Sequence, residues 1–204
     1  GRAEAQRHVS ALRQTDALVL VLRAFEDPNV FAYRDRVDPS ADWEELHSDF
    51  MLTDLQTVTN RIEKLEAQLK KPSRTKEMAK ELELQQRCAA ALENETHLSE
   101  VVTDPQEQKL LRSFALLTTK PLIVVRNLGE DQISAPPPLP DEISDGSAVA
   151  LDLAATLEAE LAQLSDDEEA EFLAEQGIEV PAIDRLTRAC FTACHRSVFF
   201  TYGE

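Results

Sequence analysis

Three short apolar runs alternate with amphipathic segments along the chain. The runs cover residues 17–22, 122–125 and 149–153, the last of which includes Asp152. The continuous run 17–22 is typical of a parallel strand covered on both faces of a sheet. Around the runs, apolar side chains recur at helical spacing in segments 3–14, 104–117, 165–176 and 181–197. Strands that alternate with helices predict an α/β fold built on a parallel sheet.

Two longer amphipathic segments, 43–70 and 75–94, follow each other directly. They are separated by Lys71-Pro-Ser-Arg74, and Pro72 disfavours helix in the residue before it. Because the connection is so short, the pattern predicts an antiparallel helical hairpin inserted into the α/β domain. The expected inward stripes are Leu52, Leu55, Val58, Ile62, Leu65 and Leu69 on the first helix, and Met78, Leu82, Gln85, Ala89 and Leu92 on the second.

Several helix ends carry local signals. Asp104-Pro105 predicts an N-cap with proline at the first helical position. Ser165 and Glu168 have the spacing of a capping box, and Gly177 is placed to stop the helix that they begin. In the last helix, we expect four side chains to face inward: Ile183, Leu186, Cys190 and Phe191.

Composition narrows the class of protein. The 204 residues are 43% apolar, enough for one real core, and the formal net charge is −17. Such a charge argues against a nonspecific nucleic-acid binder and against DNA as a partner, because phosphates are neutralised by basic surface. A local basic tip remains compatible with RNA, since six cations gather around the hairpin turn: Lys64, Lys70, Lys71, Arg74, Lys76 and Lys80. No apolar stretch approaches the roughly 20 residues of a membrane helix.

The candidate chemistry follows the second apolar run, which ends in Asn127-Leu-Gly-Glu130. In P-loop GTPases, a strand of this kind ends in Asn-Lys-x-Asp. There the Asp carboxylate accepts two hydrogen bonds from guanine, and the Asn holds the loop. Here Leu128 replaces the Lys and Glu130 replaces the Asp. Glutamate is one methylene longer and does not match the paired N–H donors of guanine, whereas adenine has no N1–H to lose. Glu130 therefore favours ATP over GTP.

Further segments in the same order resemble the YchF/Obg-like ATPase family of translation-factor-class P-loop NTPases. They are 23–30 with Val37-Asp-Pro39, 49–58, 117–122, 157–161 and 199–204. The resemblance implies a partial G-domain with an inserted coiled coil, and a base site formed by Asn127, Leu128, Glu130, Ala154 and Ala155. In the family, a Ser/Cys-Ala-Lys loop stands where this chain has Ala154-Ala-Thr156. In the family, a backbone N–H of this loop helps to read the base, and alanine retains that N–H. The lysine side chain that would cover the base is missing, because this chain has Thr156 at that position.

The same resemblance implies an internal fragment. With five glycines in all, the chain has no Gly-x-x-x-x-Gly-Lys-[Ser/Thr] phosphate loop, so no catalytic residue and no metal ligand is assigned within it. The expected domains are residues 1–42 and 101–198 for the nucleotide-binding domain, 43–100 for the coiled coil, and 199–204 for the start of a TGS domain. The expected parent is a cytoplasmic ATPase that uses ATP with Mg²⁺ and associates with the ribosome or its large subunit.

Other interpretations remain open. One is an Obg-type GTPase, and another is a non-enzymatic coiled-coil adaptor with a degenerate NTPase core. Cys190 and Cys194 lie four residues apart beside His195, which is compatible with a metal site, although free thiols of a reducing compartment are the simpler interpretation of three cysteines. Pro136-Pro-Pro-Leu-Pro140 is either a surface loop or an SH3-type ligand.

Overall fold

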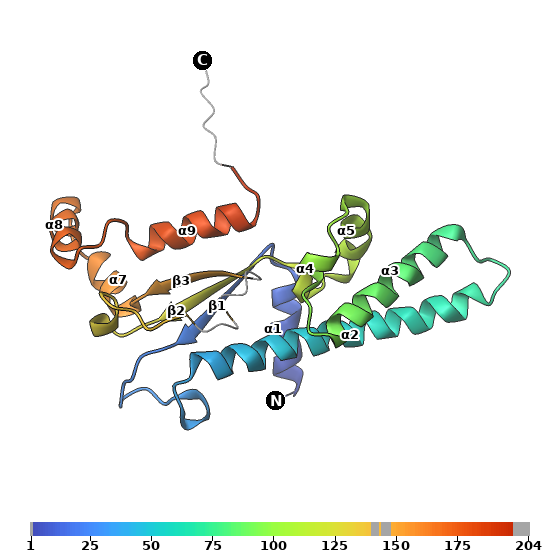
Figure 1. Cartoon of the computed structure of the whole chain (residues 1–204), viewed down its shortest axis with the longest axis horizontal. Helices are drawn as coiled ribbons and strands as arrows, with labels where there is room; N and C mark the ends of the chain where they lie inside the picture. The colour runs from blue at the N-terminus through green and yellow to red at the C-terminus, as the bar shows by residue number, and fades with distance from the viewer. Residues whose placement is uncertain (1, 140–142, 144–147, 198–204) are drawn as a thin grey trace, which may run out of the picture. The chain divides into compact units, whose positions relative to one another are not determined.

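The computed structural model describes residues 2–139, 143 and 148–197, which form two compact units. Unit 1 comprises residues 1–16 and 44–121, and unit 2 comprises residues 17–43 and 122–204. The helices and strands of both units are labelled in Figure 1. The expected TGS start at 199–204 lies outside the described residues.

Unit 2 is built on a three-stranded parallel sheet in the order β1-β2-β3. The strands are β1 (Leu18–Arg23), β2 (Leu122–Asn127) and β3 (Val149–Leu153). Leu18 pairs with Leu122 and Ile123 with Val149, so the three carboxyl ends meet at one edge of the sheet. This arrangement confirms the predicted α/β fold with a parallel sheet.

The central strand and the outer strand β1 differ in how they are covered. Residues 122–126 of β2 are all buried, as an apolar run between two neighbours requires. In β1, however, Val19 and Val21 are 45% and 62% exposed. The prediction that this run is covered on both faces is therefore wrong for β1, because the strand is at the edge of the described sheet and only one of its faces packs.

Three helices follow the sheet in unit 2: α7 (Ala155–Leu161), α8 (Asp166–Gln176) and α9 (Ala182–Ala193). The capping box of Ser165 and Glu168 is present, and Gly177 ends α8 in the left-handed conformation with φ +67°. Helix α9 packs on β2 and β3, and Ala182 at its start is buried. The prediction that Ile183 and Phe191 face inward is wrong, because they are 61% and 41% exposed, whereas Leu186 and Cys190 are half-buried.

Unit 1 contains the predicted hairpin. Helix α2 (Pro39–Leu69), whose first residues belong to unit 2, and helix α3 (Lys76–Glu93) run antiparallel (Figure 1). Helix α1 (Arg2–Arg13) belongs to the same unit, with α4 (Leu98–Val101) and α5 (Pro105–Leu111). Two 3₁₀ helices, Arg112–Phe114 and Leu117–Thr119, complete the segment that was expected to continue as one helix to residue 117. Asp104 caps α5 through its side chain, as predicted.

The hairpin seam is displaced from the predicted stripe. Val58, Leu65, Gln85 and Leu92 are buried as expected, but Leu52 is 62% exposed. The core cluster consists of Met51, Val58, Leu84, Cys88, Leu92, Leu98, Val102, Leu111 and Leu116. The prediction for Leu52 is wrong because α2 packs against the segments after α3 through Met51, one position before Leu52. Asp54, two positions after Leu52, is also buried. Among the described residues, no helix is long and apolar enough to cross a membrane.

Candidate nucleotide-base site

The loops after β2 and β3 meet at the carboxyl edge of the sheet in unit 2. The backbone N–H of Ala24 donates to the carbonyl of Asn127 at 2.8 Å, and the N–H of Leu128 donates to the carbonyl of Leu153 at 2.8 Å. These bonds extend the ladder by one residue beyond the paired strands. The residues that follow therefore leave the sheet from fixed positions.

Asn127 connects the two loops that were predicted to read the base. Its side-chain Oδ1 accepts a hydrogen bond from the backbone N–H of Ala155 at 2.9 Å. Ala155 is the first residue of α7 and is exposed, while Ala154 before it is buried. The amide of Asn127 thus holds the start of α7 against the end of β2, although 28 positions separate the two residues in the chain.

The other three positions of the motif have different environments. Leu128 is buried, so its side chain fills the interior of unit 2 and only its backbone faces the loop. Gly129 donates to the side-chain Oε1 of Gln132 at 2.7 Å, and a Cβ there would lie 2.6 Å from Oδ1 of Asp131. Glu130 is exposed at the start of a 3₁₀ helix, Glu130–Gln132. Within the described residues, its carboxylate has no ion pair or hydrogen-bond partner and its acceptors are available.

An ion pair that the sequence analysis missed lies directly beside the motif. Arg126 faces Asp152 across the β2–β3 register, with Nε to Oδ1 and Nη2 to Oδ2 distances of 2.6 Å each. The same guanidinium donates to the carbonyls of Pro137 and Pro138 at 2.9 and 3.0 Å. Arg126 is 3% exposed, so this charge is held inside unit 2 by a carboxylate and two carbonyls. The sequence feature that could have indicated this ion pair is a single arginine directly after the apolar run 122–125.

A pocket of about 470 Å³ lies on part of the same loop. Its lining comprises Ala24, Phe25, Glu26, Val37, Pro39, Arg126, Gly129, Asp131, Gln132, Pro137 and Pro138. Asn127, Glu130, Ala154 and Ala155 are not among these residues. This pocket is thus lined by residues around Arg126 and does not include the predicted base-site residues.

Known proteins resemble this chain over its whole length. No family model matches it. The ribosome-binding ATPase YchF of Bacillus subtilis is 30% identical over 210 residues, which cover 100% of this chain and 57% of that protein. The YchF of Escherichia coli O157:H7 is 29% identical over 207 residues, covering 100% and 56%. Obg-like ATPase 1 of rice (Oryza sativa subsp. indica) is 30% identical, covering 96% and 50%. The chain belongs to the YchF/Obg-like family.

The family assignment agrees with the fold. The solved structure of the Schizosaccharomyces pombe YchF GTPase superposes with a TM-score of 0.78 at 21% identity, over 91% of this chain and 52% of that one. The predicted fold class, a partial G-domain with a helical hairpin inserted in it, is thereby confirmed. This YchF-family chain spans about half the length of its relatives. The relatives also differ in name, since the bacterial and rice proteins are called ATPases and the yeast protein a GTPase.

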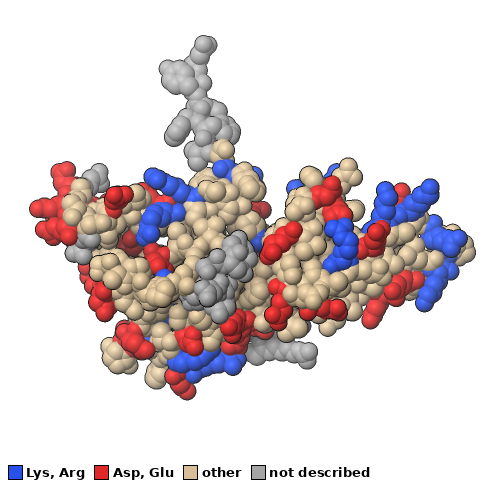
Figure 2. All heavy atoms as spheres, in the orientation of Figure 1, with Lys and Arg blue, Asp and Glu red and all other residues tan. Residues whose placement is uncertain are grey.

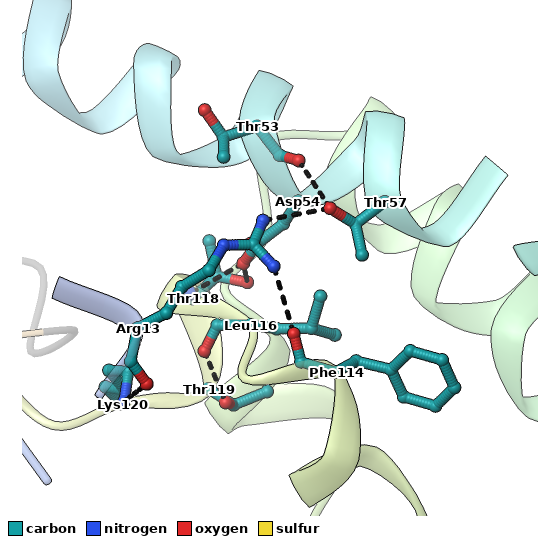
Figure 3. A network of polar contacts seen from close by, with 9 residues as sticks. All are labelled: Arg13, Thr53, Asp54, Thr57, Phe114, Leu116, Thr118, Thr119 and Lys120. Carbon is teal, nitrogen blue, oxygen red and sulfur yellow. Dashed lines mark hydrogen bonds and ion pairs between the residues drawn. The ribbon is translucent and has the colours of Figure 1, made fainter. Parts of the chain in front are cut away.

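A second polar cluster of this family member lies within unit 1 and joins α1, α2 and the segment before β2 (Figure 3). Asp54 is fully buried, and its Oδ2 accepts from both the backbone N–H and the hydroxyl of Thr118 at 2.8 Å. Arg13 lies 3.9 Å from the other carboxylate oxygen and donates to Thr57 Oγ1 at 2.9 Å and to the Phe114 carbonyl at 3.0 Å. Burial raises the pKa of Asp54, and the bonds from Thr118 and the charge of Arg13 oppose that shift.

Lys120 continues the same cluster from the opposite side. Its ammonium donates to the carbonyl of Arg13 at 3.1 Å and to the carbonyl of Thr15. Burial lowers the pKa of Lys120, and the charges of Asp16 and Asp54 act in the other direction. The cluster fixes the end of α1 to the hairpin, and because each group has a partner within the protein, its role is structural.

The described residues contain no group of three or more His, Cys, Asp or Glu side chains that could hold a metal ion. Cys190 and Cys194 are half-buried rather than fully buried, and Cys88 is the buried thiol. Burial raises the pKa of Cys88 to about 11, so this thiol stays protonated and unreactive at neutral pH.

Proposed function

We propose that unit 2 of this chain supplies the base-reading wall of an ATP site in a YchF-type ATPase. The observation that carries the proposal is the hydrogen bond from the N–H of Ala155 to the side chain of Asn127. It ties together the two loops that flank the base in proteins with the Asn-x-x-Asp motif. It also leaves Glu130 on the exposed part of the same loop, with a carboxylate that has no partner among the residues the structure describes.

The chemistry of Glu130 supports adenine as the base. A carboxylate that reads guanine accepts from N1–H and the exocyclic amine at the same time, and this bidentate geometry requires an exact side-chain length. Glutamate displaces the two oxygens by one methylene. Adenine has only an exocyclic amine as donor on its Watson–Crick edge, so a single carboxylate oxygen or a backbone carbonyl is sufficient.

Hydrolysis belongs to the parent protein in this proposal. Phosphoryl transfer depends on a phosphate-binding loop and a Mg²⁺ ion that cradle the phosphates, and the 204 residues contain no such loop. The names of the bacterial relatives support ATP hydrolysis and ribosome binding as the parent's activities, in the cytoplasm where ribosomes work. The residues of this chain would then position the base, and the Mg²⁺ ligands would come from elsewhere in the parent.

Glu130→Asp is expected to move nucleotide preference toward GTP. The shorter carboxylate restores the bidentate match to guanine, and one or two added hydrogen bonds are worth about 1.4 kcal/mol, or about tenfold in the ratio of GTP to ATP affinity. Competition of ATP and GTP for a fluorescent nucleotide on the parent protein measures this ratio. An unchanged ratio would show that Glu130 is not the selecting residue and would leave the GTPase alternative in place.

Asn127→Ala serves as the matched comparison. It removes the acceptor for Ala155 N–H without touching the carboxylate, so we expect ATP and GTP affinity to fall together, each by about tenfold. The same competition assay separates the two variants, because one changes the ratio and the other changes both affinities. If Asn127→Ala left both affinities intact, the contact between the loops would have no part in base binding.

A further inference from the structure

The pocket of about 470 Å³ beside Arg126 has no part in the proposed base site. Its walls come from three segments of unit 2, which are the residues after β1, the residues around the start of α2 and the loop after β2. Most of the walls are apolar, and they are formed by Ala24, Phe25, Val37, Pro39, Pro137 and Pro138. A concave site of this size, with apolar walls and a few polar groups, is typical of ligand binding.

Two carboxylates line this pocket without a partner in the part of the chain that the structure describes. Glu26 follows β1 and Asp131 lies on the loop after β2; both residues are exposed, and the side chain of neither forms an ion pair or a hydrogen bond with a described residue. The buried Arg126 also lines the pocket, but Asp152 matches its charge. The lining residues therefore present two uncompensated anions to a ligand.

One wall of the pocket is held in place by Arg23 at the end of β1. Its guanidinium donates to the carbonyls of Phe25, Asp27 and Val30 at 2.9, 3.3 and 2.9 Å. It also lies 4.7 Å from the centre of the Phe25 ring. Because these contacts fix the ring and the loop before a ligand arrives, less entropy is lost on binding. They also engage the charge of Arg23 away from the two carboxylates.

Unit 2 carries nearly all of the negative charge of the chain. Residues 17–43 and 122–204 contain 22 acidic and 7 basic residues, which gives −15 of the net charge of −17. Figure 2 shows red side chains gathered over α8 of this unit. A surface of this sign attracts cations and repels nucleic acids. The charge of the unit is therefore complementary to a basic partner.

We propose that this pocket binds an arginine side chain from a basic peptide segment of a partner protein. A guanidinium has five donors in one plane, so a single side chain can donate to two carboxylates and still pack flat on an aromatic or proline face. Glu26 and Asp131 supply the acceptors, and Phe25 is such a face. Gln132 accepts from the Gly129 N–H through Oε1 at 2.7 Å, and its Nε2 is left to donate to a carbonyl of the peptide backbone.

The loop beside the pocket favours a peptide over a small cation such as a polyamine. Residues 27–36 connect Glu26 to Val37, and both of these residues line the pocket. On this loop, Val30 is 48% exposed, Tyr33 58% and Phe31 100%. A peptide that places arginine in the pocket has further residues to cover these apolar side chains, and exposed apolar groups of this kind mark protein interaction sites.

The test measures the binding of two fluorescein-labelled peptides to the 204-residue chain. The peptides are identical serine- and alanine-based sequences that carry either arginine or lysine at the same positions. The pocket variant combines Glu26→Gln with Asp131→Asn. Its matched control combines Glu171→Gln with Glu175→Gln, which are exposed carboxylates on α8, so both variants lose two negative charges. Anisotropy is recorded at about 0.15 M salt, where distant charges are screened, and urea unfolding followed by Trp43 fluorescence checks the fold.

We expect the pocket variant to lose about tenfold in affinity for the arginine peptide, because two charge-assisted hydrogen bonds are removed. The control should change by less than about twofold. The unaltered chain should bind the arginine peptide more tightly than the lysine peptide, and spermidine should compete only weakly. Equal losses in the two variants would overturn the proposal, because the general charge of unit 2 would then attract the peptide. Equal affinity for lysine peptide or spermidine would overturn it as well.

A variant without a charge change tests the aromatic wall. Phe25→Leu keeps both carboxylates but removes the ring, so the affinity for the arginine peptide should fall about threefold. The affinity for the lysine peptide should fall less, because an ammonium does not stack on the ring. An unchanged affinity for the arginine peptide would contradict binding in this pocket. No nucleotide is present in these measurements, so their result does not depend on the proposed base site.

Discussion

Replacing Arg126 by methionine is expected to lower the free energy of unfolding of unit 2 by about 3 kcal/mol. Arg126 is 3% exposed and is bonded to both oxygens of Asp152 and to the carbonyls of Pro137 and Pro138. Methionine keeps much of the side-chain volume, but it leaves a partly buried carboxylate and two carbonyls without their donor. The chain has a single tryptophan, Trp43, which is buried in unit 2, so its fluorescence during urea unfolding reports on this unit.

Two further variants make the result specific to the ion pair. Arg188→Met removes an exposed arginine on α9 and should change stability by no more than about 0.5 kcal/mol. Combining Arg126→Met with Asp152→Leu removes both charges, and the double variant should be more stable than Arg126→Met alone, because the uncompensated carboxylate is gone. If Arg126→Met were as mild as Arg188→Met, the guanidinium would not hold the β2–β3 edge together.

Replacing Asp54 by alanine is expected to destabilise unit 1 by about 3 kcal/mol. The variant leaves the buried N–H and hydroxyl of Thr118 without their acceptor and leaves Arg13 without its nearby anion. Loss of helical circular dichroism in urea measures the change. Asp54→Asn keeps one acceptor oxygen for Thr118 and should be milder than alanine. A loss of no more than about 0.5 kcal/mol in the alanine variant would show that the hydrogen bonds of the carboxylate do not stabilise the fold.

The contribution of Asp54 to the free energy of unfolding is expected to depend on pH. Burial raises the pKa of Asp54 above its ordinary value of 3.8, so the folded protein binds this proton more tightly than the unfolded chain does. The resulting stabilisation is fully present below pH 3.8 and is lost as the pH rises through the raised folded pKa. The free energy of unfolding of the wild type, minus that of Asp54→Asn, should therefore fall as the pH rises through this window. A difference that stayed constant or rose with pH would contradict the burial of this carboxylate.

Local sequence patterns were sufficient to predict the helices and strands and the family resemblance. The apolar runs at 17–22 and 122–125, and the segment 149–153 with Asp152 as its one polar residue, became the three strands, because largely apolar runs of this length are stable inside a sheet. Pro72 in a four-residue break was enough for an antiparallel hairpin. The capping box at Ser165 and the stop at Gly177 were confirmed because these signals act within one turn of helix. The residues of the capping box, the helix stop and the hairpin turn are neighbours in the sequence.

Which face of an element is covered was not determined by its own residues. Leu52 and Met51 lie one position apart on α2, and the packing of later segments decided that Met51 is buried. Val19 and Val21 belong to an apolar run, yet the position of β1 at the sheet edge leaves them exposed. In α9, the small Ala182 is buried and the larger Ile183 beside it is exposed.

The sequence by itself determined the fold class, the hairpin and the motif with glutamate in the place of aspartate, since each depends on residue type and short spacing. Only the tertiary structure decided three contacts. Asn127 accepts a hydrogen bond from Ala155, Arg126 forms an ion pair with Asp152, and Asp54 accepts hydrogen bonds from Thr118. These partners are 28, 26 and 64 positions apart. Strand register and helix packing bring them together, and the low polarity of the interior strengthens the contacts of Arg126 and Asp54.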